Sequence, residues 1–301
     1  MLQFIHDLET AQVGEIRYNE PLAPYTTWKI GGPADLFIVP ATKEKLAVCL
    51  KLLNQYSLPW LVIGRGSNLL VGDQGFRGVV LKINETLEFI RFEGTLVYAG
   101  AACSFVKLSR LAAKEGLTGL EFAGGIPGSV GGAVYMNAGA HGSDISHILK
   151  QAEVMLQTGE LIIMQKEELQ YAYRHSLLHH VPGIVTEAVF ELMEGDRKEI
   201  AGAMAAYRDR RVRTQPLQMA CAGSVFRNPD HDHAARLIEA AGLKGLRVGG
   251  AEVSEKHANF IVNIGQATAQ DVLTLIDLIQ TTIKQKFGIQ LIPEVLVVGA
   301  C

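Results

Sequence analysis

The amino-acid sequence predicts an α+β fold with two domains. Strand-like and helix-like segments are mixed along the chain, without the steady alternation that a doubly wound parallel sheet requires. A charged helical segment at about residues 195–217, ending at Pro216, is typical of a domain boundary. With 301 residues, 48% of them hydrophobic, the chain is long enough to bury two cores. We therefore expect an N-terminal domain at residues 1–200 and a smaller C-terminal domain at residues 201–301.

The N-terminal half contains an amphipathic helix followed by several strands. Apolar residues Leu46, Cys49, Leu50 and Leu53 recur at the spacing of one helix face, which predicts a helix over residues 42–56. Pro59 ends this pattern, and residues 60–64 (WLVIG) then predict a short buried strand. Residues 78–83 and 96–101 also have the composition of strands. Residues 104–116 predict a helix with Ser104 as N-cap and Gly116 just past its end.

The C-terminal half is predicted to hold two helices and three strands besides the charged boundary helix. Strands are expected at residues 183–192, 259–265 and 291–299, and a helix at residues 233–242. A longer helix is indicated by one apolar stripe, which ends before Gly288 and consists of Val272, Leu275, Ile276, Ile279 and Ile283.

Composition and charge exclude several classes of partner. Charged residues make up 20% of the chain and the formal net charge is −3, so no basic surface is expected for nucleic acid or an anionic membrane. The N-terminus has early acidic residues and no uninterrupted apolar stretch, and no apolar run approaches membrane-spanning length. The four cysteines form no CxxC pair, which argues against a zinc site or a disulfide framework. We expect a cytoplasmic protein without nucleic-acid, membrane or metal partners.

Two glycine-rich stretches are the first candidates for a binding site. Gly64 to Asn68 (GRGSN) follows a predicted strand, where backbone N–H groups can turn toward phosphate oxygens. The stretch lacks the third glycine of a dinucleotide-binding fingerprint, and taken alone it is equally consistent with a simple turn. Residues 124–142 are so rich in glycine, with Pro127, that no regular helix interior or central strand is expected there. Together the two stretches favour an elongated nucleotide-type cofactor that the backbone approaches at several points.

Three other motifs give weak or no support for a functional site. No lysine completes a GxxxxGK[ST] loop, so ATP chemistry has no support. His231 and His233 form an HxH pair, but the segment favours a polar helix start capped by Asp230 or Asp232 over a metal site. Cys221 has no assured histidine or cationic neighbour to activate it, and we interpret it as incidental.

For three polar residues, the sequence alone allows either a chemical role or a structural one. Ser224 stands in no GxSxG elbow, so it is a poor nucleophile candidate but could donate a proton or a hydrogen bond. For Arg174, in Tyr173-Arg174-His175-Ser176, an exposed turn is the default interpretation of an isolated arginine. Glu294 follows Pro293 at the head of a predicted strand, where it could be a solvated edge charge.

Read together, the motifs of the chain resemble the UDP-N-acetylenolpyruvoylglucosamine reductase family. The resemblance rests on TTWKIGGPADLF, VIGRGSNLLVGDQGFRGVVLKI, EFAGGIPGSVGGAVYMNAGAHG, YRHS, GSVFRNP, AGLKGLRVGGAEVSEKHANFIVN and PEVLVVG, which occur in the family's order and span nearly the whole chain. It implies an FAD-binding domain of the vanillyl-alcohol-oxidase type and a smaller C-terminal domain that binds the substrate. The FAD-binding residues that it implies are Ile63, Gly64, Arg65, Gly66, Ser67, Asn68, Leu69, Gly124, Gly125, Ile126, Pro127, Gly128, Ser129, Gly131, Gly132, Ala133, Asn137, Ala140, Ile184 and Val185.

The resemblance also implies a reaction and the residues that carry it. NADPH reduces FAD, and the enolpyruvyl group of a UDP-sugar is then reduced, a step of peptidoglycan synthesis. Arg174 matches the arginine that holds the substrate carboxylate and the developing charge, Ser224 the serine that protonates carbon, and Glu294 the glutamate that assists there. Tyr173, Arg227 and Asn228 match positions that contact the substrate.

The chain resembles the shorter form of the family. Longer members place a tyrosine-bearing loop between the arginine and serine motifs, whereas Arg174 and Ser224 are only 50 positions apart here. No lid tyrosine is therefore assigned, and we expect a monomer or weak oligomer. Two alternatives are another FAD-dependent oxidase or dehydrogenase of the same fold, and a flavin-binding module without activity. The retention of Arg174, Ser224 and Glu294 together favours the reductase.

Overall fold

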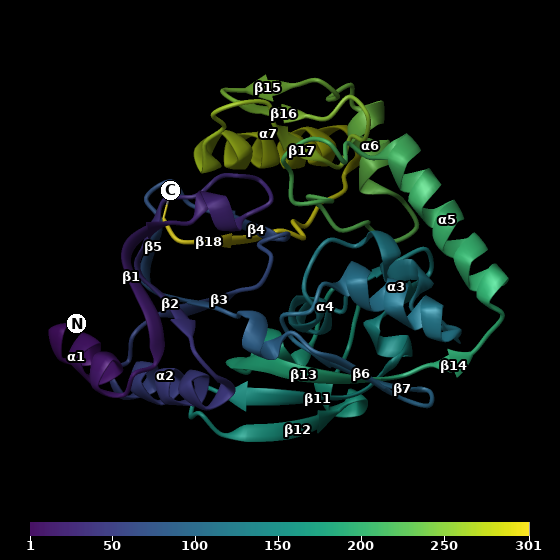
Figure 1. Cartoon of the computed structure of the whole chain (residues 1–301). Coiled ribbons are helices and arrows are strands. Elements are labelled where there is room, and N and C mark those ends of the chain that lie inside the picture. Colours follow the sequence, from purple (N-terminus) through teal and green to yellow (C-terminus); the bar gives the residue numbers. More distant parts are fainter. Residues whose placement is uncertain (301) are drawn as a thin grey trace. The chain divides into compact units, whose positions relative to one another are not determined.

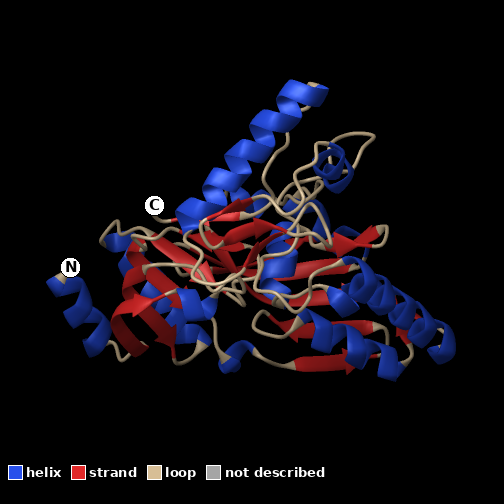
Figure 2. Cartoon of the chain, turned by 90° about the horizontal axis from the view of Figure 1, so that it is seen from above, coloured by secondary structure: helices blue, strands red, loops and turns tan. Residues whose placement is uncertain are grey.

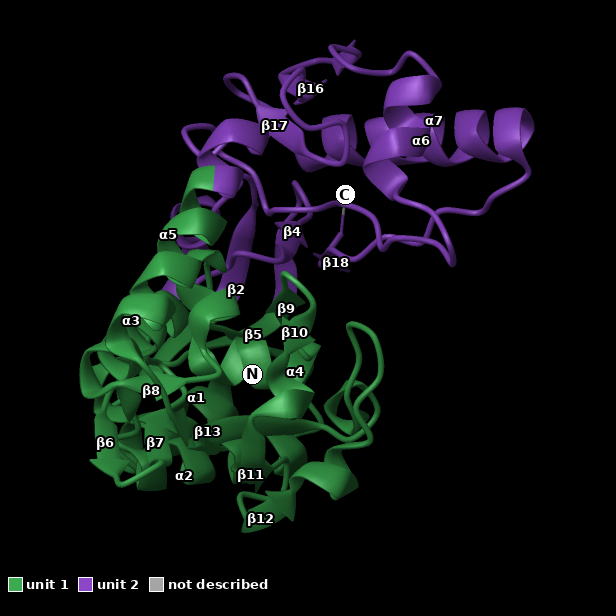
Figure 3. Cartoon of the chain, turned by 90° about the vertical axis from the view of Figure 1, so that its right-hand side faces the viewer, with its two compact units in different colours: residues 1–17, 36–64, 78–209 green, residues 18–35, 65–77, 210–301 purple. Residues whose placement is uncertain are grey.

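The computed structural model describes residues 1–300, which form two compact units (Figure 3). Unit 1 comprises residues 1–17, 36–64 and 78–209, and unit 2 comprises residues 18–35, 65–77 and 210–301. The last segment of unit 2 begins inside the predicted boundary segment 195–217. Two N-terminal segments also belong to unit 2, so that unit is assembled from three separate stretches of chain.

The chain contains helices and strands throughout (Figures 1 and 2), as expected for an α+β fold. The α-helices are α1 (Leu2–Thr10), α2 (Lys43–Gln55), α3 (Phe105–Glu115), α4 (Val130–Met136), α5 (Arg197–Thr214), α6 (Ala234–Ala240) and α7 (Ala269–Phe287). The strands are β1 (Gly14–Pro21), β2 (Pro33–Pro40), β3 (Trp60–Ile63), β4 (Leu69–Val71), β5 (Phe76–Lys82), β6 (Ile90–Glu93), β7 (Leu96–Gly100), β8 (Leu117–Thr118), β9 (Gly139–Ala140), β10 (Ser143–Asp144), β11 (Leu149–Leu156), β12 (Leu161–Gln165), β13 (Gly183–Glu191), β14 (Met193–Glu194), β15 (Arg247–Val248), β16 (Ala251–Val253), β17 (Ile261–Asn263) and β18 (Leu296–Val298).

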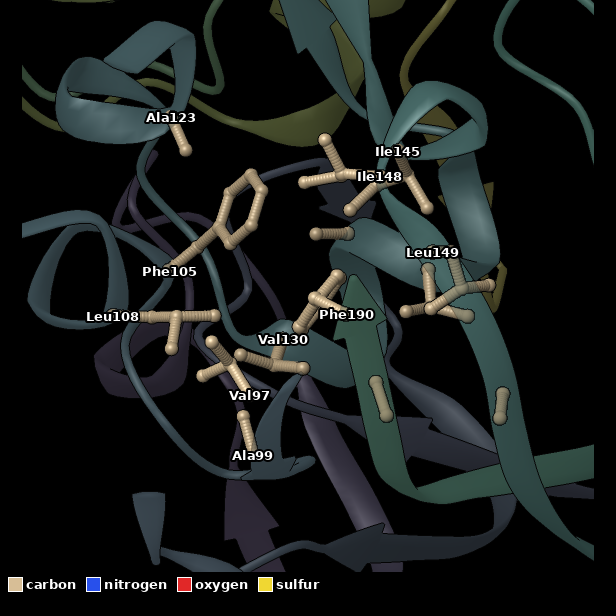
Figure 4. Packing of buried hydrophobic residues seen from close by; sticks show 14 of the residues in the cluster. Val97, Ala99, Phe105, Leu108, Ala123, Val130, Ile145, Ile148, Leu149 and Phe190 are labelled. Carbon is tan, nitrogen blue, oxygen red and sulfur yellow. The ribbon is translucent and has the colours of Figure 1, made fainter. Parts of the chain in front are cut away.

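A five-stranded antiparallel sheet forms the centre of unit 1, with strand order β12-β11-β13-β7-β6. Helices α3 and α4 bury their apolar sides in the same core as this sheet, as Figure 4 shows for Phe105 of α3, Val130 of α4 and Phe190 of β13. The predicted caps of α3 are confirmed: Ser104 accepts a hydrogen bond from the N–H of Lys107, and Gly116 adopts the left-handed conformation with φ +77°.

A second sheet has strand order β1-β2-β5-β3, in which β3 and β5 run parallel. Helices α1 and α2 pack in its core through residues that include Phe4 and Leu50. All four residues of the predicted apolar face of α2 are buried, which confirms the periodicity argument, and Thr42 caps the helix. Strands β1, β2 and β5 each contribute residues to both units.

Unit 2 is built around α7. The apolar residues predicted on one face of this helix are buried in a core shared with α6 and with a three-stranded sheet of order β15-β16-β17. Strands β4 and β18 pair in parallel, although more than two hundred residues separate them in the sequence. Trp28 is fully buried and its indole N–H donates to the carbonyl oxygen of Ile261 at 2.8 Å. These contacts explain why the short segments 18–35 and 65–77 belong to the unit of the C-terminal residues.

Two local expectations are wrong. The second glycine-rich stretch does contain a helix, α4, because Gly131 and Gly132 occupy its first turn and Ser129 caps it. Neither Asp230 nor Asp232 caps α6: the N–H of Ala234 donates to Oδ1 of Asn228 at 3.1 Å. Asp232 instead accepts a hydrogen bond from the Arg236 guanidinium, which lowers the pKa of its carboxyl to about 2.

Residues 1–300 contain no helix long and apolar enough to cross a lipid bilayer. No group of three or more His, Cys, Asp or Glu side chains in this part of the chain is arranged to hold a metal ion.

Candidate functional site

The first glycine loop, Gly64 to Asn68, depends on glycine at Gly66. This residue is buried and has φ +61°, and a Cβ there would clash with the carbonyl oxygen of Tyr25. The N–H of Thr27 donates to the carbonyl oxygen of Gly66 at 3.1 Å and holds the loop in place. Within residues 1–300, the N–H groups of Arg65 and Gly66 donate to no acceptor of the chain. They are therefore available to a ligand with anionic oxygens.

The second glycine-rich stretch comes very close to the first within unit 1. A Cβ on Gly64 would lie 2.5 Å from Oγ of Ser129, so the Ser129 side chain packs this closely only because residue 64 has no side chain. The first N–H groups of α4 already have acceptors: Val130 donates to Cys103 and Gly131 to Ala101. The helix start is therefore fixed by the protein itself.

We predict that Gly64→Ala weakens FAD binding by about tenfold, because the new methyl group must displace Ser129. Gly202→Ala is the matched control, since a Cβ at that position on α5 meets nothing within 4 Å. The measurement is a titration of flavin-free protein with FAD, followed by fluorescence. Equal FAD affinity in Gly64→Ala and Gly202→Ala would show that the close approach of the loops is irrelevant to the cofactor.

Arg174 is held by the carbonyl groups of the neighbouring hairpin. It lies in a tight turn with φ +55°, and its guanidinium donates to the carbonyl oxygens of Gly139 (2.6 Å) and Asn137 (3.4 Å). The guanidinium also lies 5.1 Å from the ring centre of the exposed Tyr173. These contacts fix the orientation of the guanidinium, a group that can hydrogen-bond anionic oxygens.

Ser224 and Glu294 are brought together by backbone pairing in unit 2. The N–H of Glu294 donates to the carbonyl oxygen of Val225 at 2.7 Å, and the N–H of Arg227 donates to that of Ile292 at 2.9 Å. Asn68 of the first glycine loop joins them, because its side chain donates to the carbonyl oxygen of Glu294 at 3.1 Å. Three motifs that are far apart in the sequence are therefore adjacent in this unit.

Comparisons with known proteins identify the family. A family model described as "UDP-N-acetylenolpyruvoylglucosamine reductase, C-terminal domain" matches residues 215–298, and one described as "FAD binding domain" matches residues 34–165. UDP-N-acetylenolpyruvoylglucosamine reductase 1 of Bacillus cereus is 52% identical over 99% of this chain and 100% of its own length. The chain belongs to the UDP-N-acetylenolpyruvoylglucosamine reductase family.

Other members of the reductase family agree with this assignment. The reductase of Bacillus subtilis is 48% identical, with 99% of both chains covered. The crystal structure of the reductase from Thermus caldophilus superposes with a TM-score of 0.81 at 38% identity, covering 95% of this chain and 98% of that one. The expected α+β fold with an FAD-binding domain is confirmed, and FAD is the cofactor.

The glycine loops of this reductase fit FAD. The unpaired N–H groups of Arg65 and Gly66 suit a diphosphate. Other residues on the expected FAD list have mainly structural contacts. Ile184 and Val185 are buried in the cores beside β11, and the amide of Asn137 donates to the carbonyl oxygen of Ala172.

The sequence did not single out Asn259, which the structure places directly on the serine motif of the reductase. Its side chain accepts from the N–H of Phe226 at 2.9 Å and donates to the carbonyl oxygen of the same residue at 2.8 Å. Its own carbonyl oxygen accepts from the N–H of Val225 at 2.9 Å. Asn259 thereby fixes the segment just after Ser224. A buried asparagine before a strand, in HANFIV, was the available signal.

Cys221 and the histidine pair have no place in the chemistry that this site supports. Burial raises the pKa of the Cys221 thiol. The thiol therefore stays protonated at neutral pH and is not a reactive thiolate. His231 has φ +61° in the turn before α6, and His233 occupies the N-cap position of that helix.

Proposed function

We propose that this chain catalyses the NADPH-dependent, FAD-mediated reduction of UDP-N-acetylglucosamine enolpyruvate to UDP-N-acetylmuramate, a step of peptidoglycan precursor synthesis. The observation that carries this proposal is the 52% identity to the Bacillus cereus reductase over 99% of the chain. The adjacency of the serine, glutamate and first glycine motifs supports it. We further propose that Arg174, Ser224 and Glu294 act on the substrate.

The reaction adds one hydride and one proton across the carbon–carbon double bond of the enolpyruvyl group. Bound FAD, once reduced by NADPH, supplies the hydride to the methylene carbon. Negative charge then develops on the adjacent carbon and spreads into the carboxylate. The residues of the chain must bind the carboxylate, stabilise that charge and deliver the proton.

Arg174 is proposed to bind the substrate carboxylate and the developing charge. A guanidinium presents two parallel N–H donors to planar oxygens, and its charge is retained at any physiological pH. Its contacts with the carbonyl oxygens of Gly139 and Asn137 fix its orientation before substrate arrives. An oriented donor costs no reorganisation when charge forms, which is the main source of electrostatic catalysis.

Ser224 is proposed to donate the proton, with Glu294 assisting by positioning a proton relay. A serine hydroxyl is a weak acid, so this role requires a strongly basic intermediate and a fixed geometry. Backbone pairing of the segments that contain Ser224 and Glu294, and the side chain of Asn259, provide that geometry.

The remaining assignments belong to the same proposal. We assign residues 1–200 to FAD binding and residues 201–301 to substrate binding. Tyr173, Arg227 and Asn228 are proposed substrate contacts, although the side chain of Asn228 also caps α6. The substrate partner is a UDP-sugar, and we propose a cytoplasmic monomer or weak oligomer.

The test is anaerobic stopped-flow absorbance of the holoenzyme, mixed first with NADPH and then with the enolpyruvyl UDP-sugar. We expect the flavin absorbance to bleach with NADPH and to return when substrate is added. Bleaching that only oxygen reverses would refute the substrate assignment. A protein that binds no FAD would refute the whole proposal.

A further inference from the structure

Two aromatic rings from distant parts of unit 1 stack face to face. His141 and Tyr207 have ring centres 4.0 Å apart and an angle of 3° between their planes. Tyr207 belongs to α5, and His141 lies between β9 and β10, all labelled in Figure 3. His141 and Gly142 have φ +56° and +85°, as in a two-residue hairpin turn with both central residues left-handed. The tip of this hairpin is therefore held by a ring from a helix.

Arg174 is hydrogen-bonded to the base of the same hairpin. Its guanidinium donates to the carbonyl oxygen of Gly139, the first residue of β9, and to that of Asn137, just before β9. Asn137 in turn accepts from the N–H of Ser146, beyond β10. Tyr207 at the tip and Arg174 at the base are thus connected through one short hairpin.

The hairpin itself is short. Its strands β9 and β10 contain two residues each, and such a short hairpin has little independent stability. Helix α5 is mostly exposed, with Ile200 as its one buried residue, so Tyr207 contributes little to a hydrophobic core. A parallel ring stack at this point fixes the hairpin more than it stabilises the helix.

We propose that Tyr207 and His141 are positioning residues that hold Arg174 in the orientation required for substrate reduction. This inference rests on the role of Arg174 in the proposed function. Neither ring needs to touch substrate, since the effect passes through the backbone of the hairpin to the guanidinium. Displacement of a charge-stabilising group by about 1 Å can cost on the order of 10²-fold in rate, so loss of the stack has a measurable consequence.

The test compares Tyr207→Ala with Tyr207→Phe in the two half-reactions of the holoenzyme. Tyr207→Phe keeps the ring and should remain within about twofold of the parent in both. Tyr207→Ala should slow reoxidation of the flavin by the enolpyruvyl UDP-sugar about tenfold or more, through kcat more than KM, and leave bleaching by NADPH unchanged. Equal slowing of both half-reactions, or a parallel loss of bound flavin, would show a merely structural role and overturn the inference.

A double-mutant cycle with Arg174→Ala separates this inference from the proposed function. If Tyr207 acts through Arg174, Tyr207→Ala should have no further effect on substrate reduction in the Arg174→Ala background. Full additivity of the two effects overturns the inference. Slow substrate reduction in Arg174→Ala with a normal rate in Tyr207→Ala refutes the positioning role alone. A normal rate in Arg174→Ala refutes the proposed role of Arg174 and the inference with it.

Discussion

Replacing Ser224 by alanine is expected to slow reduction of the enolpyruvyl substrate by about 10² to 10⁴-fold, the usual contribution of a positioned proton donor. The effect should be confined to this half-reaction, because the hydroxyl takes no part in hydride transfer from NADPH. Single-turnover stopped-flow absorbance measures each half-reaction separately: bleaching by NADPH should keep its rate, and recovery with the UDP-sugar should become slow.

Ser224→Cys is the matched variant, since it keeps a side chain of similar size with a proton to donate. It should retain more activity than Ser224→Ala, and the structure gives no reason for either variant to misfold. The segment after Ser224 is held by backbone hydrogen bonds of Val225 with Glu294 and of Arg227 with Ile292, and by Asn259, and none of these requires the serine side chain. Equal loss of both half-reactions in Ser224→Ala would disprove the assigned role.

Elements with local signals were predicted well from the sequence. The stripe of α7 and the face of α2 are set by periodic apolar residues, and the ends of α3 are set by Ser104 and Gly116. Each of these signals acts within one helix, so no knowledge of the rest of the fold was needed. Helix α4 was missed because its glycines lower helix propensity, while its packing against β13 depends on the folded sheet.

Contacts over long sequence distances could not be predicted. The carboxylate of Asp73 accepts from the N–H groups of Ala269 and Gln270 at the start of α7, and nothing near Asp73 in the sequence indicates this partner. The site shows the same limit. Motifs and resemblance identified Ser224 and Glu294 as separate candidates, but only tertiary structure shows that their backbone segments pair and that Asn68 contacts Glu294. The stack of His141 on Tyr207 also has no local signal.

Replacing Arg174 by alanine is expected to slow substrate reduction by about 10² to 10³-fold, the usual cost of removing one preorganised donor to a developing negative charge. KM for the UDP-sugar should also rise, because the guanidinium is proposed to bind the carboxylate of the ground state as well as the charge of the intermediate. Reduction of the flavin by NADPH should change much less. Steady-state kinetics, combined with single-turnover measurement of each half-reaction, test all three expectations.

The Arg174→Ala substitution could also lower activity by disturbing the structure, so it needs a control. Arg174 donates to the carbonyl oxygens of Gly139 and Asn137, so alanine removes support from the hairpin as well as a positive charge. Arg174→Lys keeps the charge but loses the planar pair of donors, and should fall between the parent and Arg174→Ala. Added guanidinium ion supplies the missing group without restoring the hairpin contacts of the covalent side chain. Partial recovery of substrate reduction in Arg174→Ala by guanidinium would therefore assign the loss to chemistry, whereas no recovery together with lower thermal stability would assign it to the scaffold.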